Sequence, residues 1–212
     1  MSTSVRLLQP ADLAAVADLH RVAFPDYRST RLGSRYCCRM LQAYAAHPDS
    51  WVAVARSDAG ARPIGYLVAA PPEVQRALNR SLRPWAALAL ASSPRRLGGA
   101  RRAAPPTSAR SLSPAPSLDD GTAGTPEATS VPATIRVVLI GTDPSVRGVG
   151  VGATLLADFA RRAAAAGHEV ADLTVAVANR AARLAYARAG WTEVGVEGDV
   201  AVRCRLELGP TT

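Results

Sequence analysis

The sequence predicts a mixed α/β fold in which short strands alternate with amphipathic helices. Runs rich in valine and isoleucine recur along the chain, and between most of them apolar residues return at helical spacing. A glycine-rich turn, Gly148–Gly152, joins one such strand to one such helix. The resulting order is β-α-α-β-β, an interruption, and then β-α-β-α-β-β.

Each element is delimited by residues that favour turns or helix ends. Pro25 follows the first helix, Asn179 is placed to cap the last one, and Gly167 and Gly190 end the two later helices. In chain order, the predicted elements are strand 5–8, helices 13–23 and 29–46, strands 51–55 and 64–69, strand 134–142, a helix opened by 148–152, strand 170–177, helix 179–189, and strands 191–194 and 200–208.

The interruption spans residues 72–132 and is predicted to be an insert within a single domain, 1–212. Apolar residues at helical spacing predict a basic helical arm over about 73–102, which Pro84 must kink or split. We favour an arm packed on the sheet edge over a membrane-surface helix, and a lid over a substrate is the other alternative. Residues from about 103 to 132 contain few large apolar side chains and predict a disordered linker.

The composition excludes several classes of function. The formal net charge is +8, but all 25 basic residues are arginine, so no lysine can form a Schiff base. Isoleucine, asparagine and phenylalanine are scarce, which indicates a GC-rich genome rather than a surface selected for nucleic acid. The longest apolar run, 85–91, is too short to span a membrane, and the first residues resemble no export signal. We therefore expect a cytoplasmic protein without nucleic-acid or membrane partners.

The cysteines and histidines do not predict a metal site. Cys37 and Cys38 are adjacent and Cys204 is distant, so no pair has the spacing of a zinc ligand set. The histidines are far apart and lie near no cysteine at ligand spacing. The cysteines are interpreted as buried apolar residues in a reducing compartment.

The turn Arg147–Gly152 carries the clearest chemical signal. Glycines leave backbone N–H groups unshielded, the following helix adds a partial positive charge, and Arg147 adds a forked cation suited to phosphate. A diphosphate cradle is the favoured interpretation; a turn that is rich in glycine for steric reasons alone is the alternative. Gly148-x-Gly150-x-x-Ala153 also satisfies the dinucleotide fingerprint, but five residues separate that fingerprint from the strand, and too little chain follows it.

Three segments resemble the GNAT superfamily of N-acetyltransferases. Arg147-x-x-Gly150-x-Gly152 matches the loop that binds the acyl-CoA pyrophosphate, and the segment from Asn179 through Tyr186 to Trp191 is similar to the superfamily's N-x-x-A-x-x-x-Y…G-F/W pattern. The first residues, 5–12, are similar to its opening strand. The resemblance covers about 1–70 and 134–208.

The resemblance implies a mixed, mostly antiparallel central sheet of about seven strands flanked by helices, in which strands 134–142 and 170–177 splay apart around acetyl-CoA. It implies no metal. It makes Tyr186 the donor of a proton to the departing thiolate. The cofactor-binding residues that it implies are Leu139, Ile140, Thr142, Arg147, Gly148, Val149, Gly150, Val151, Gly152, Ala153 and Asn179.

The predicted function is that of an acetyl-CoA-dependent N-acetyltransferase acting on a primary amine of a small molecule, by direct attack on the thioester. Phe24–Arg28 and the arm are expected on the acceptor side. The strand before the loop carries Arg136 where many members have a carboxylate, leaving Asp26, Glu73 and Asp172 as candidate bases or deprotonation to solvent. A protein or peptide acetyltransferase and a non-catalytic acyl-CoA-binding module remain alternatives, and a homodimer is left open.

Overall fold

The computed structural model describes residues 2–58, 60, 62–91 and 133–209. Its centre is one sheet of seven strands in the order β1-β2-β3-β4-β5-β7-β6, in which only β4 and β5 run parallel. The predicted mixed, mostly antiparallel sheet is confirmed. The elements are β1 (Thr3–Leu7), a 3-10 turn (Pro10–Asp12), α1 (Leu13–Ala23), α2 (Arg28–Leu32), α3 (Ser34–Ala46), β2 (Trp51–Ser57), β3 (Pro63–Ala70), α4 (Pro72–Ser81), α5 (Arg83–Ala91), β4 (Thr134–Thr142), a 3-10 turn (Pro144–Val146), α6 (Val151–Ala165), β5 (Val170–Ala176), α7 (Arg180–Arg188), β6 (Thr192–Glu197) and β7 (Ala201–Glu207).

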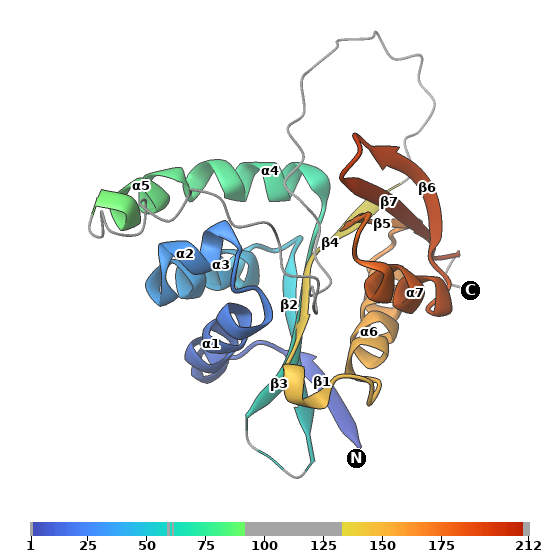
Figure 1. Cartoon of the computed structure of the whole chain (residues 1–212), viewed down its shortest axis with the longest axis horizontal. Helices are drawn as coiled ribbons and strands as arrows, with labels where there is room; N and C mark the ends of the chain where they lie inside the picture. Colours follow the sequence, from blue (N-terminus) through green and yellow to red (C-terminus); the bar gives the residue numbers. More distant parts are fainter. Residues whose placement is uncertain (1, 59, 61, 92–132, 210–212) are drawn as a thin grey trace, which may run out of the picture.

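Helices cover both faces of the sheet, and each face has its own apolar core. In Figure 1, α1, α2 and α3 lie on one side of the strands, and α6 and α7 lie on the other. Tyr44 and Tyr66 are buried in the first core, while Phe159 and Leu155 are buried in the second. The strands between the two cores are buried on both faces, as their continuous apolar runs predict.

The predicted helix over 29–46 is wrong in one respect, because it is two helices. Gly33 has a φ of +98°, a backbone conformation that interrupts the helix and that residues with a side chain rarely adopt. The chain turns there, and α3 starts afresh with the Cys37 amide donating to the Gly33 carbonyl. The apolar spacing hides this break because it continues in phase across the glycine.

The chain that follows β3 forms two helices, α4 and α5, which adjoin at Leu82. Pro84 is the second residue of α5, a position where proline lacks no helical hydrogen bond. The guanidinium of Arg39 on α3 lies 4.7 Å from the ring centre of Trp85, so a cation–π contact ties α5 to α3. The rest of the predicted arm, 92–102, and the predicted linker, 103–132, lie outside the described residues.

In the described part of the chain, no helix has both the length and the hydropathy needed to cross a bilayer.

A buried histidine ties together three elements on the first face. His20 of α1 is fully buried; its Nδ1 lies 2.5 Å from Tyr66 Oη on β3 and its Nε2 lies 2.7 Å from Ser29 Oγ on α2. Both ring nitrogens are therefore hydrogen-bonded, which is what makes burial of a neutral imidazole tolerable. Burial lowers the pKa of His20 from 6.5 to about 4.

We predict that acid destabilises the fold through His20. The imidazole of His20 takes up a proton around pH 6.5 in the unfolded chain but only near pH 4 in the folded protein. The contribution of neutral His20 to stability is therefore complete above pH 6.5 and is lost as the pH falls to 4. The loss is about 3 kcal/mol. Urea unfolding at pH 7, 5.5 and 4 measures it, and His20→Gln should flatten this part of the profile. Equal pH dependence in both proteins would contradict the assignment.

Candidate active site

Strands β4 and β5 separate in the middle of the sheet. They pair at only three positions, Thr134 with Val170, Ile135 with Ala171 and Arg136 with Asp172. Beyond Arg136, β4 continues beside β3 to Thr142, while β5 continues beside β7 to Ala176. The splaying expected for strands 134–142 and 170–177 is thus confirmed, and it leaves one edge of each strand without a neighbouring strand.

A β-bulge in β4 lies directly after the point of separation. Val68 of β3 pairs with Leu139 and Ala69 pairs with Val137, so Val138 is the extra residue. As a result, Val138 and Leu139 are both buried in the first core, and Ile140 returns to the second. Bulges of this kind bend a strand and increase its twist. The bulge therefore directs β4 away from β5.

The glycine turn lies at the wide end of this opening, between β4 and α6. Its residues from Arg147 to Gly150 are exposed, and α6 begins at Val151 with Gly150 as N-cap. In the described part of the chain, the amides from Gly148 to Ala153 donate to no backbone carbonyl, and the first amide that does belongs to Thr154. A row of unpaired N–H donors at the start of a 15-residue helix is a strong anion site.

Two glycines give this turn its conformation. Gly148 and Gly150 have φ values of +83° and +88°, which a side chain would strain. A Cβ atom at either position would meet no atom within 4 Å. The space in front of the amides is therefore open, and a phosphate group can approach the backbone closely.

The tight turn before the glycines is held by Asp143, as expected from the sequence. Its carboxylate accepts hydrogen bonds from the amide and hydroxyl of Ser145, at 2.9 and 2.7 Å. These hydrogen bonds lower the pKa of Asp143. Its own amide donates to the Ile64 carbonyl of β3 at 2.9 Å, which anchors the turn to the sheet.

Tyr186 of α7 is 1% exposed, so its phenol ring lies in the protein interior. Its ring centre lies 6.0 Å from that of Trp191, and no group in the described residues hydrogen-bonds its buried Oη atom. Burial raises the pKa of this phenol well above its usual value, and Cys204 and Tyr27 add to the rise.

Asn179 is the N-cap of α7, as predicted. Its side-chain oxygen accepts from the Ala182 amide at 3.2 Å, and the residue is 5% exposed. Capping accounts for this oxygen, and contact with a cofactor stays a prediction. Contact of Leu139, Ile140 and Thr142 with a cofactor also stays a prediction. These residues lie on β4 beyond its last pairing with β5, where one edge of the strand borders the opening.

The candidate bases are not equivalent in the structure. Both oxygens of Asp172 accept from Arg136, at 2.6 and 2.7 Å, so this carboxylate is already engaged in a two-point contact. Asp26 is exposed in the α1–α2 connection, and Glu73 lies in the first turn of α4. The hypothesis that Asp172 replaces the missing carboxylate of β4 is therefore not supported.

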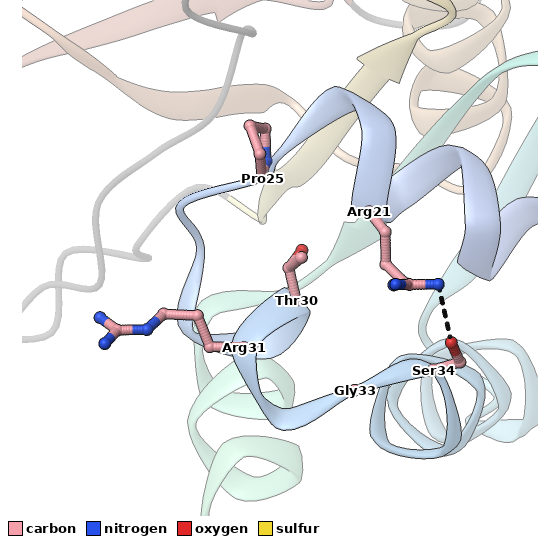
Figure 2. Close-up of a pocket in the computed structure, with 6 residues that line it drawn as sticks. All are labelled: Arg21, Pro25, Thr30, Arg31, Gly33 and Ser34. Carbon is pink, nitrogen blue, oxygen red and sulfur yellow. Dashed lines mark hydrogen bonds between the residues drawn. The ribbon is translucent and has the colours of Figure 1, made fainter. Parts of the chain in front are cut away.

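An open pocket lies between the end of α1, α2 and the start of α3 (Figure 2). Arg21 Nη1 donates to Ser34 Oγ across it at 3.1 Å, and the buried Oγ1 of Thr30 has no partner among the described residues. The pocket includes Pro25, within the segment expected on the acceptor side. It is lined by Arg21, Pro25, Thr30, Arg31, Gly33 and Ser34.

Three features of the structure are not encoded by any local sequence pattern: the bulge at Val138, the ion pair of Arg136 with Asp172 and the polar contacts of His20. Each joins residues that are distant in the chain, and no local pattern signals them. Arg136 is the third residue of β4 and Asp172 is the third residue of β5. A parallel alignment of these two strands from their first residues would therefore have suggested the ion pair.

A family model matches residues 119–202, and its description is an acetyltransferase (GNAT) domain. The match includes the glycine turn, Asn179 and Tyr186. A search of curated proteins found no significant match.

Solved structures with the same fold include several bacterial acetyltransferases. The ribosomal-protein-S18-alanine N-acetyltransferase of Escherichia coli is 11% identical, with a TM-score of 0.57 over 100% of this chain and 97% of that chain. An N-acetyltransferase from Staphylococcus aureus Mu50 is 14% identical, with a TM-score of 0.59 over 99% and 100%. A GNAT-family acetyltransferase from Streptococcus pneumoniae is 16% identical, with a TM-score of 0.58 over 98% and 100%. At these identities the likeness establishes the fold.

We predict opposite effects of removing two buried tyrosine hydroxyls. Tyr186→Phe should leave the free energy of unfolding unchanged or raise it by up to about 2 kcal/mol, because an unpaired buried hydroxyl is unfavourable. Tyr66→Phe, the matched control, should lower it by about 1–3 kcal/mol, because it leaves His20 Nδ1 unpaired. Urea unfolding at pH 7 measures both. A clear loss of stability in Tyr186→Phe would contradict the unpaired hydroxyl.

Proposed function

Because the chain belongs to the GNAT acetyltransferase superfamily, we propose that it transfers an acetyl group from acetyl-CoA to a primary amine of a small molecule. The observation that carries this proposal is the opening between β4 and β5, with unpaired amides at its wide end. An elongated acyl-CoA has a phosphate-rich end and an extended arm that contains amides. The unpaired amides of the turn are complementary to the phosphates, and the free edge of β4 is complementary to the arm.

The residues fit this cofactor. The amides from Gly148 to Ala153 and the guanidinium of Arg147 hold the diphosphate, in the open space where Gly150 lacks a side chain. The unpaired edge of β4, near Leu139, Ile140 and Thr142, pairs with the amides of the pantetheine arm as a further strand would.

Acetyl-CoA, when bound, supplies a thioester whose carbonyl carbon an amine can attack directly. Tyr186 keeps its proton at neutral pH, because burial raises the pKa of its phenol. Its unpaired hydroxyl donates to the departing sulfur as negative charge develops there, in surroundings with little water to compete.

The proton of the acceptor amine can pass to solvent, to Asp26 or to Glu73. Asp172 is held by Arg136, and β4 carries no carboxylate between Thr134 and Thr142. A protonated amine must release this proton before it can attack, so no residue of β4 assists that step.

A small acceptor is supported by the helices beside the α1–α2 connection. In Figure 1, α4 and α5 run along the side occupied by α2 and α3, and Trp85 is held there by Arg39. An extended peptide would need an open groove on that side. Transfer to a protein or peptide and binding of acyl-CoA without catalysis are the alternatives. A cytoplasmic location and a homodimer stay predictions.

Thermal unfolding with acetyl-CoA, CoA and NAD tests the cofactor. At a concentration about 100-fold above its dissociation constant, acetyl-CoA should add about 2.7 kcal/mol of stability and raise the melting temperature. Gly150→Trp should abolish this gain by filling the space before the amides. Gly167→Trp is the matched control, since Gly167 also has positive φ, at +81°, and follows the other end of α6.

Stabilisation by NAD alone, or equal stabilisation of the two glycine variants, would contradict the assignment. Thiol release in the presence of pooled small amines or pooled peptides then separates the acceptor classes. Tyr186→Phe should bind acetyl-CoA normally but release thiol at least 10-fold more slowly. Binding with no release for any acceptor would support the non-catalytic alternative.

A further inference from the structure

An ion pair joins β4 and β5 at their last paired position. Arg136 donates through Nε and Nη2 to the two oxygens of Asp172, at 2.6 and 2.7 Å. The side chains are 19% and 13% exposed. Forked, two-point contacts of this kind fix the relative orientation of both groups, and partial burial protects them from screening by salt.

No strand-to-strand pairing holds β4 and β5 together beyond this point. Each then follows a different neighbour: β4 pairs with β3 as far as Thr142, and β5 pairs with β7 as far as Ala176. The two halves of the sheet therefore diverge from a junction of three residue pairs that ends at Arg136 and Asp172.

The ion pair also stands next to the bulge that turns β4 away. Only Val137 separates Arg136 from Val138. The carboxylate of Asp172 holds the side chain of Arg136, which lies just before the bulge. The direction in which β4 leaves the junction therefore depends on the position of Arg136. On the other side, Asp172 is paired through β5 to Arg205 of β7, so the contact links one half of the sheet to the other.

We propose that Arg136 and Asp172 are positioning residues that set the depth and width of the acetyl-CoA groove. This inference rests on the proposed function. The ion pair keeps β4 and β5 joined as far as Arg136 and Asp172, where their pairing ends. Beyond this point, it holds the unpaired edge of β4 at the distance from β5 that the pantetheine arm needs. Without the pair, the junction opens further or the strands shift in register.

A second two-point ion pair in the protein has similar geometry but is more exposed to solvent, and it therefore serves for comparison. Arg183 donates to both oxygens of Glu193 at 2.7 and 2.8 Å, with similar geometry. That pair joins α7 to β6, away from the junction, and its side chains are 30% and 42% exposed. Glu193→Gln is therefore a matched control for removing one partner.

The test compares Asp172→Asn, Arg136→Lys and Glu193→Gln. Arg136→Lys keeps the charge without the fork, so it remains informative if Asp172→Asn fails to fold. Calorimetric titration gives the dissociation constant for acetyl-CoA. We expect it to rise roughly 10-fold in both junction variants, which corresponds to about 1.4 kcal/mol of binding free energy, and to stay within about twofold in Glu193→Gln.

Hydrogen exchange of the ligand-free proteins provides a second readout. Amides of 134–137 and 170–173 should exchange faster in the junction variants than in the wild type, and Glu193→Gln should leave them unchanged. The combined variant Arg136→Asp with Asp172→Arg reverses the pair and should restore slow exchange.

The two proposals fail separately. If the wild type does not bind acetyl-CoA, the proposed function fails, while hydrogen exchange still decides whether the pair holds the junction. If the wild type binds and both junction variants bind equally well with unchanged exchange, the positioning role is overturned.

Discussion

The structure depends on the early end of the pairing between two parallel strands. After Arg136 and Asp172, β4 and β5 have no ladder between them, although β4 continues beside β3, apart from the bulge at Val138, and β5 continues beside β7. Unpaired backbone groups inside a protein are unfavourable unless another partner satisfies them. A molecule with its own amides, held in extended form, is such a partner. Under the proposed function, the interruption of the sheet is the surface that binds acetyl-CoA.

The surroundings keep this opening in place. The bulge at Val138 changes the direction of β4. The second apolar core packs residues of β3, β4, β5 and β7 against α6, and it therefore holds both halves of the sheet around the opening. At the wide end, two glycines with positive φ hold the turn so that the first amides of α6 remain available. Tyr186 adds a buried hydroxyl with no partner in the described residues, which is unfavourable for stability and which the proposed function uses as a proton donor.

Local sequence patterns predicted most of the fold and the chemically distinctive turn. The order of strands and helices, the cap at Asn179 and the turn at Asp143 depend on neighbours in the chain, and each is found in the structure. The break at Gly33 was missed because the apolar spacing continues across it. The pair of Arg136 with Asp172 and the contacts of His20 depend on packing between distant segments, which no single segment encodes.

A crystal structure of the protein with CoA tests the central claim most directly. The account predicts the pantetheine arm between β4 and β5, hydrogen-bonded to the edge of β4 beyond Arg136, with the diphosphate on the amides of Gly148 to Ala153. The sulfur should lie within hydrogen-bonding distance of Tyr186 Oη. Density for CoA elsewhere, with β4 and β5 still unoccupied along their facing edges, would contradict it.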